Sequence, residues 1–136
     1  MKSKMLFLTI VAALAIVGCQ ETNKQQQTKD LHVIAQSTDQ WTGVAVSNSN
    51  RIFVNFPYWS ENATTSVAEI VNGQIKPYPS KKWNKRTNKG GFLAVQSVFI
   101  DDKNQLWVLD TRNPRFSGVD SVGPLLYKFD LKTNKL

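Results

Sequence analysis

Hydrophobic and polar positions after residue 30 follow each other in short blocks, without the spacing of an amphipathic helix. Four apolar runs, separated by polar segments, occupy 44–46, 52–56, 67–71 and 74–78. The same order returns at 95–100, 106–110, 125–130 and from 135 onward. Short runs bounded by Asn, Asp, Gly and Pro are typical of β-strands. The pattern therefore predicts an all-β chain made of two similar units, each with four strands.

The two units are copies of one repeat. Residues 43–54 align without a gap with residues 97–108, and each copy is an apolar run, a polar turn and a second apolar run. Self-similarity over roughly 40 to 60 residues, with four strands per repeat, is typical of β-propeller blades. We therefore expect a six-bladed β-propeller, of which about two four-stranded blades are present. Blade one is expected at about 41–79, and blade two, truncated, at about 92–136.

Two blades cannot close a ring, because a propeller needs about four or more. We expect residues 31–136 to be the N-terminal part of a longer propeller, since the sequence stops at Leu136, just inside the expected outer strand of blade two. An alternative stays open, in which three copies of a two-blade chain assemble into one ring. The sequence does not decide the oligomeric state.

Residues 1–18 have the features of a lipoprotein signal peptide. Two lysines precede an apolar stretch at 5–17, which is too short to span a membrane comfortably. The stretch ends in a sequence that resembles a bacterial lipobox, so we expect lipidation of Cys19 and a polar tether at 19–30. We therefore expect an exported protein, anchored to a membrane through its lipid and facing the periplasm or the cell exterior. The alternative is a plain signal peptide with a chance Cys.

The composition narrows the class of partner. The formal net charge is +7, and much of the excess lies in a cationic cluster around Trp83. Its members are Lys81, Lys82, Lys85, Arg86 and Lys89. The cluster fits either a solvated surface loop or contact with a phosphate, a sulfated glycan or an anionic lipid surface. Nucleic acid is not an expected partner of an exported protein. Because Cys19 is the only Cys, no internal disulfide is expected.

The connections between the expected strands are of two kinds. In an up-and-down order, the short turns lie at one end of the blades, and the long connections 57–66, 79–92 and 111–124 lie at the other. Long loops on a rigid scaffold usually carry binding residues, so we expect the functional face at the long-loop end. A short apolar run at 31–35 is expected to be a further strand that closes the ring by pairing into the last blade.

Five residues on the long-loop face are candidate ligand-binding residues, and each also has a structural reading. Phe56, Tyr58 and Trp59 offer a stacking surface, or they pack between blades. Asp110 accepts a hydrogen bond from a ligand, or it holds loop amides. Arg112 binds a carboxylate or phosphate, or it pairs with an Asp in blades that lie beyond this sequence.

Several segments together resemble the yellow / major royal jelly protein family. They lie at 53–59, 77–84, 97–101, 106–111 and 126–131. The resemblance implies a six-bladed propeller and a protein longer than this chain. Among insect members, it further implies secretion and, in some, either binding of small aromatic amines in the central cavity or conversion of dopachrome.

The expected function is binding of a small organic ligand in the axial cavity. The alternative is an enzyme, either a gluconolactonase-like metal-dependent hydrolase or a dopachrome-type isomerase, and a scaffold role stays open. The lactonase resemblance requires an early Glu where this chain has Thr42 or Gln40, which weakens that reading. No cofactor is evident, and a divalent metal such as calcium is expected only under the hydrolase alternative. Catalytic residues stay unknown, because the single His32 allows no Ser-His-Asp triad or His-based metal site.

Overall fold

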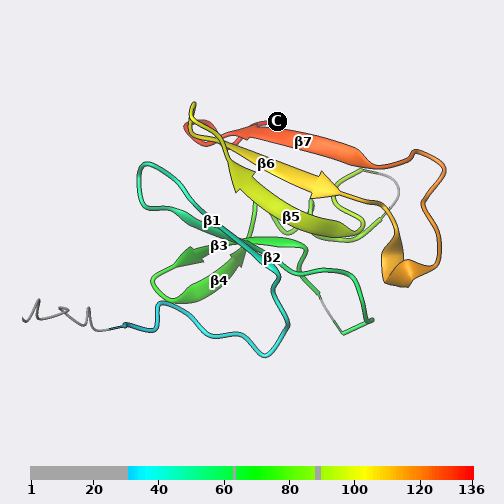
Figure 1. Ribbon diagram of the computed structural model, residues 1–136, viewed down its shortest axis with the longest axis horizontal. Coiled ribbons are helices and arrows are strands. Elements are labelled where there is room, and N and C mark those ends of the chain that lie inside the picture. The colour runs from blue at the N-terminus through cyan, green and yellow to red at the C-terminus, as the bar shows by residue number, and fades with distance from the viewer. Residues whose placement is uncertain (1–30, 63, 88–89) are drawn as a thin grey trace, which may run out of the picture. The chain divides into compact units, whose positions relative to one another are not determined.

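The computed structural model describes residues 31–62, 64–87 and 90–136. The chain divides into two units, 1–31 and 32–136, and only Leu31 of the first is described. All elements named below belong to the second unit (Figure 1). The expected signal peptide, the tether and Cys19 lie outside the described residues.

The first repeat folds into a four-stranded antiparallel sheet with the strand order β1-β2-β3-β4. Its strands are β1 (Gly43–Val46), β2 (Ile52–Asn55), β3 (Val67–Val71) and β4 (Gln74–Pro77). Asn72 and Gly73 join β3 to β4, and both have positive φ, as a two-residue hairpin turn requires. The four strands predicted for this repeat are confirmed, with ends that differ by about one residue.

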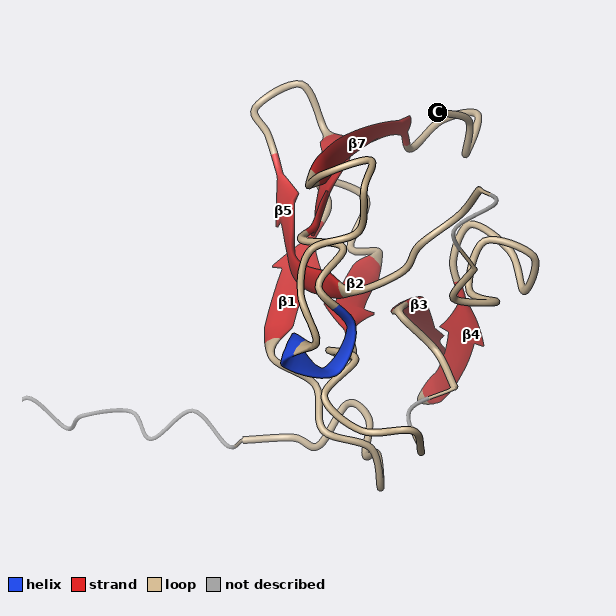
Figure 2. Ribbon diagram, turned by 90° about the vertical axis from the view of Figure 1, so that its right-hand side faces the viewer, coloured by secondary structure: helices blue, strands red, loops and turns tan. Residues whose placement is uncertain are grey.

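The second repeat folds into a three-stranded antiparallel sheet with the order β5-β6-β7. Its strands are β5 (Val95–Ile100), β6 (Gln105–Asp110) and β7 (Leu125–Asp130). The expected fourth strand is present only as a single bridge between Asp130 and Lys135. The one helical element of the described residues is the short 3-10 turn η1 (Pro114–Phe116), blue in Figure 2, so the fold class is all-β.

The repeat is reproduced in the hydrogen bonds of its first turn. Asn50 N donates to Ser47 O at 2.9 Å, and Asn104 N donates to Asp101 O at 3.0 Å. Asn50 and Asn104 both have left-handed backbone conformations, with φ of 60° and 59°. Asn tolerates this region better than most residues, which explains its presence at both turns.

The main core lies between the two sheets. Ala45 and Phe53 of the first sheet face Val98, Leu106 and other side chains of the second. An aromatic group completes this core, in which Trp83 packs edge-on against Tyr127 and Phe129, while Phe92 contacts both of these rings. At about 25 cal/mol per Å² of apolar surface, burial of these side chains is the main force that holds the sheets together.

The prediction of a strand at 31–35 is wrong for this structure, because the run forms no strand and lies beside the first sheet instead. A strand requires a partner edge, and the last blade that was expected to supply it is not among the described residues. The described residues also form no helix that is long and apolar enough to cross a membrane.

Candidate ligand-binding site

The long connections meet at one end of the two sheets, as predicted. The antiparallel strand directions place 57–66, 79–92 and 111–124 at this end, on the right in Figure 1, and the short turns at the other. Several contacts join the first and third connections, among them an ion pair between Arg115 and Glu61. Arg115 N donates to Tyr58 O at 2.8 Å, and the Trp59 and Phe116 rings stack with centroids 6.3 Å apart.

Phe56 is a packing residue in this structure. Its side chain is buried, belongs to a small apolar cluster with Val54 and Ala68, and lies 5.9 Å from the Trp41 ring. Tyr58 is half-buried, and the guanidinium of Arg86 lies over its ring at 4.3 Å. Trp59 is 40% exposed, so of the three aromatic candidates it offers the most accessible surface for stacking.

Asp110 holds the main chain around the end of β6. Its buried carboxylate accepts three N–H groups, from Leu93 at 2.7 Å, Ala94 at 2.8 Å and Arg112 at 2.9 Å. Hydrogen bonds to a charged group stabilise by about 1.5–3 kcal/mol. Asp110 therefore fixes the start of β5 against the connection that leaves β6.

Arg112 is paired within the chain. Its buried guanidinium donates from Nη2 to Asp120 Oδ1 at 2.9 Å. The N–H of Val122 and the Arg112 guanidinium lower the pKa of Asp120, so this carboxylate is charged at neutral pH. The sequence-based alternative of a partner Asp in further blades is therefore wrong, because the partner lies eight residues away in the same connection.

Asn84 is a key residue of this end that sequence reasoning missed. Its Oδ1 accepts the N–H groups of Ser66 and Val67 at 2.8 and 2.9 Å, and its Nδ2 donates to the carbonyls of Tyr78 and Ser80 at 2.9 and 3.0 Å. Both donors and both acceptor positions of one amide are therefore used. A lone Asn in a lysine-rich loop gave no sequence signal for this role.

The predicted cationic cluster divides in the structure. Lys81, Lys82 and Lys85 are exposed, whereas Arg86 turns inward and is half-buried. Lys89 lies outside the described residues. The three lysines keep the surface character predicted for the loop, whereas Arg86 bonds to the carbonyls of Phe56 and Thr65.

The positions discussed for a metal do not gather carboxylates. Thr42 accepts a hydrogen bond from Asn55 Nδ2 at 3.0 Å and donates to the carbonyl of Gln96 at 3.5 Å. Gln40 lines a separate hollow that Trp59 also borders. Within the described part of the chain, no three His, Cys, Asp or Glu side chains are grouped to hold a metal ion.

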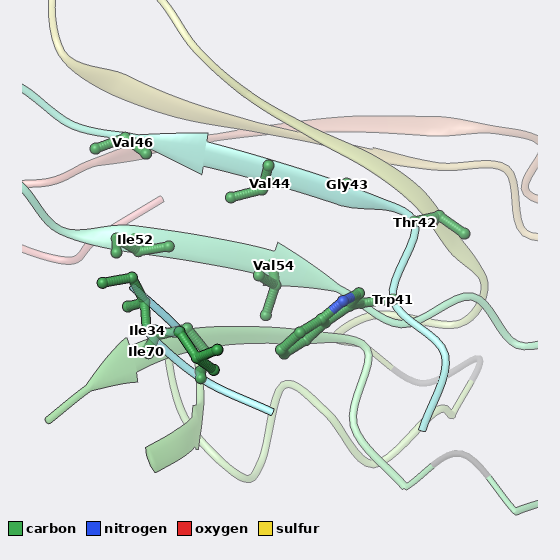
Figure 3. A pocket seen from close by; sticks show the side chains of 11 residues that line it. Ile34, Trp41, Thr42, Gly43, Val44, Val46, Ile52, Val54 and Ile70 are labelled. Atoms are coloured by element: carbon green, nitrogen blue, oxygen red, sulfur yellow. The ribbon is translucent and has the colours of Figure 1, made fainter. Parts of the chain in front are cut away.

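An apolar groove of about 460 Å³ lies on the outer face of the first sheet, away from the second sheet (Figure 3). Its walls include Ile34, Trp41, Val44, Val54 and Ile70. Few polar groups point into it, so a ligand there has little to orient it. We interpret this groove as an uncovered sheet face.

The chain matches no family model and no curated protein. The resemblance to the yellow / major royal jelly protein family therefore stays a prediction that rests on the sequence segments named above.

Proposed function

We propose that the two sheets are neighbouring blades of a β-propeller whose complete ring binds a small organic ligand in its axial cavity. One observation carries the proposal. The two faces that are buried in the middle of this structure have repeat equivalents on its two outer sides, and these equivalents are apolar and include the exposed Phe99 and Val44.

The first comparison starts from the face of the first sheet that packs on the second sheet. Ala45 and Phe53 lie on this face and are buried. Their repeat equivalents are Phe99 and Trp107, which lie on the opposite, outer face of the second sheet. Phe99 is 63% exposed, and Leu126 on the same face is 59% exposed. An apolar face is therefore left uncovered where the repeat calls for another sheet.

The second half is the converse. Val98 and Val108 of the second sheet are buried against the first. Their equivalents, Val44 and Val54, lie on the outer face of the first sheet. Val44 is 66% exposed and lines the groove in Figure 3, whereas Val54 is buried in the small cluster with Phe56 and Ala68. Each outer face thus has apolar surface on which a further sheet would pack, in the way that the two described sheets pack on each other.

Positions that face the interface in one repeat thus lie on the outer face in the other, and this reversal favours a propeller over a free-standing sandwich of two sheets. A sandwich keeps polar residues on its outer faces, whereas stacked repeats require a neighbour on both sides. Strands β1 and β5 also run side by side in the same direction, with Thr42 bonded to Gln96 near their starts and Asn48 to Asn104 just beyond their ends. Inner strands of adjacent blades have this relation.

The ligand follows from the position of the long connections and from the family resemblance. Long loops gather at one end of the blades, where binding residues of rigid scaffolds usually lie. The count of six blades, the lipid anchor at Cys19 and the axial ligand are parts of the proposal that rest on the sequence.

The experiment places a charge on each outer face of the protein as the cell makes it. Val44→Asp and Phe99→Asp are each expected to destabilise the fold by more than about 3 kcal/mol, because a covered charge without a partner costs that much. On an uncovered face, the same changes cost about 1 kcal/mol or less. Asn48→Asp in an exposed turn is the control. A native melting temperature in both outer-face variants would refute the proposal.

A further inference from the structure

Three arginines lie on the long connections, and two of them have acidic partners. Arg112 pairs with Asp120, and Arg115 pairs with Glu61. Arg86 has no carboxylate within ion-pair distance among residues 31–62, 64–87 and 90–136. Among these three arginines, Arg86 is the one whose charge the described acidic side chains do not directly neutralise.

The contacts of Arg86 use only part of its hydrogen-bonding capacity. Its Nη2 donates to Thr65 O at 2.6 Å and to Phe56 O at 3.3 Å, and the guanidinium stacks on Tyr58. Its Nε and Nη1 are buried and have no acceptor among the described residues. Burial lowers the pKa of Arg86, which confirms that the charge is poorly solvated. An orphaned, buried N–H of a charged group is costly, so an acceptor oxygen supplied from outside would be favourable.

A hollow of about 380 Å³ borders Arg86. Arg86, Thr87, Leu93, Pro114, Gly118 and Asp120 line it. Leu93 and Pro114 give it an apolar wall, and Arg86 supplies a cation. The negative charge of Asp120 is paired with Arg112. This combination suits a ligand with one negative group and an apolar body.

We propose that this hollow binds a small organic carboxylate and that Arg86 anchors its oxygens. Carboxylate oxygens match the planar N–H groups of Arg and complete its hydrogen bonding. A doubly charged phosphate fits less well, because Asp110 and Asp39 already act on the Arg86 charge and would repel a second negative charge. To expose Nε or Nη1 to the ligand, the Arg86 side chain turns toward the hollow and gives up its longer bond, to Phe56 O.

The inference goes beyond the proposed axial cavity. Every residue that the site uses is described, and none belongs to a blade beyond the two described sheets. Failure of the carboxylate site therefore leaves the propeller proposal standing, and failure of the propeller proposal leaves this site standing.

The test titrates the full chain with benzoate and follows the arginine Nε–H signals by NMR. A saturable shift of the Arg86 signal is expected, with a Kd of about 1 mM, as is usual for so small a ligand. Inorganic phosphate is expected to bind at least about tenfold more weakly. Arg86→Lys keeps the charge but loses the planar donor set, so it is expected to weaken benzoate binding about tenfold. Arg115→Lys, at a paired and more exposed site, is the matched control and is expected to bind as the unchanged chain does.

A second pair of variants leaves Arg86 unchanged, so its result does not depend on whether Arg86 mutants fold. Thr87 is exposed and lines the hollow, so Thr87→Glu places an internal carboxylate beside Arg86. It is expected to abolish benzoate binding and to raise the melting temperature, whereas Thr87→Gln leaves both near native. Benzoate binding that is absent in the unchanged chain, or equal in Thr87→Glu and Thr87→Gln, would overturn the proposal.

Discussion

Removal of the Asn84 amide tests how the long connections are held. Asn84→Ala deletes two acceptor and two donor contacts in one step, which join Ser66 and Val67 to the end of β4. The side chain is 5% exposed, so three of these contacts lie in the interior, and the fourth, to the Ser80 carbonyl, is partly buried. Water can replace the fourth contact but not the others.

The magnitude follows from the groups that lose a partner. Each buried polar group left without a hydrogen bond costs about 1–3 kcal/mol. Three such groups give a loss of about 3 kcal/mol or more in the free energy of unfolding, even if the loops relax in part. Native domains are stable by only about 5–15 kcal/mol, so this loss is a large share of the total.

The assay is urea unfolding followed by tryptophan fluorescence, since Trp83 is adjacent to Asn84 and packs on the core. Asn113→Ala is the matched control, because Asn113 makes one exposed bond, to Gly118 N, and should cost less than about 1 kcal/mol. If Asn84→Ala and Asn113→Ala lower the free energy of unfolding equally, the inference that the Asn84 hydrogen bonds hold these connections together is refuted.

Three further predictions concern other contacts. Asp110→Asn should lower the free energy of unfolding by about 2–4 kcal/mol, because three N–H groups share its carboxylate. Asp102→Asn, at an exposed position, is the control and should change it little. Equal urea midpoints of the two variants would contradict this. Gly91→Ala should lower the free energy of unfolding by more than about 2 kcal/mol, because its φ is +84° and a Cβ would lie 2.6 Å from Trp83 O. In Gly118→Ala the Cβ meets no atom within 4 Å, so only backbone strain destabilises this variant. Thermal melts of the two variants test the difference. Hydrogen bonds from Trp107 Nε1 and from the Gln105 and Lys103 N–H groups lower the pKa of Asp101. Its contribution to stability is therefore present above the unfolded pKa of about 3.9 and is lost as the pH falls through the lower folded pKa. Melting temperatures of Asp101→Asn and the unchanged chain should converge as the pH is lowered through this range, and a constant gap would contradict this.

The sequence predicted the strands well because each is coded locally. Alternating apolar positions and turn residues such as Asn50, Asn72 and Gly73 mark where strands begin and end. The long-loop end was also predictable, because it follows from strand order alone. The isolated run at 31–35 was misassigned since a strand depends on a partner edge, which no local pattern reveals.

Side-chain partners at the candidate site were harder to predict. Asp110 and Arg112 were identified with both readings open, because only the fold decides whether a polar group meets main-chain amides or solvent. Arg86 was hidden among surface lysines of the same charge, and its inward turn depends on Tyr58 and Thr65, which lie more than twenty residues earlier.

The most direct test of the central claim measures whether the two outer sheet faces are covered in the protein as the cell makes it. Val44→Cys and Phe99→Cys report on the two faces, Ser49→Cys in an exposed turn gives the rate of free labelling, and the parent chain gives the background from Cys19. Blades within a ring predict that a thiol reagent labels both outer-face positions at least about 100-fold more slowly than Ser49→Cys. Labelling of both positions as fast as the turn would contradict the propeller.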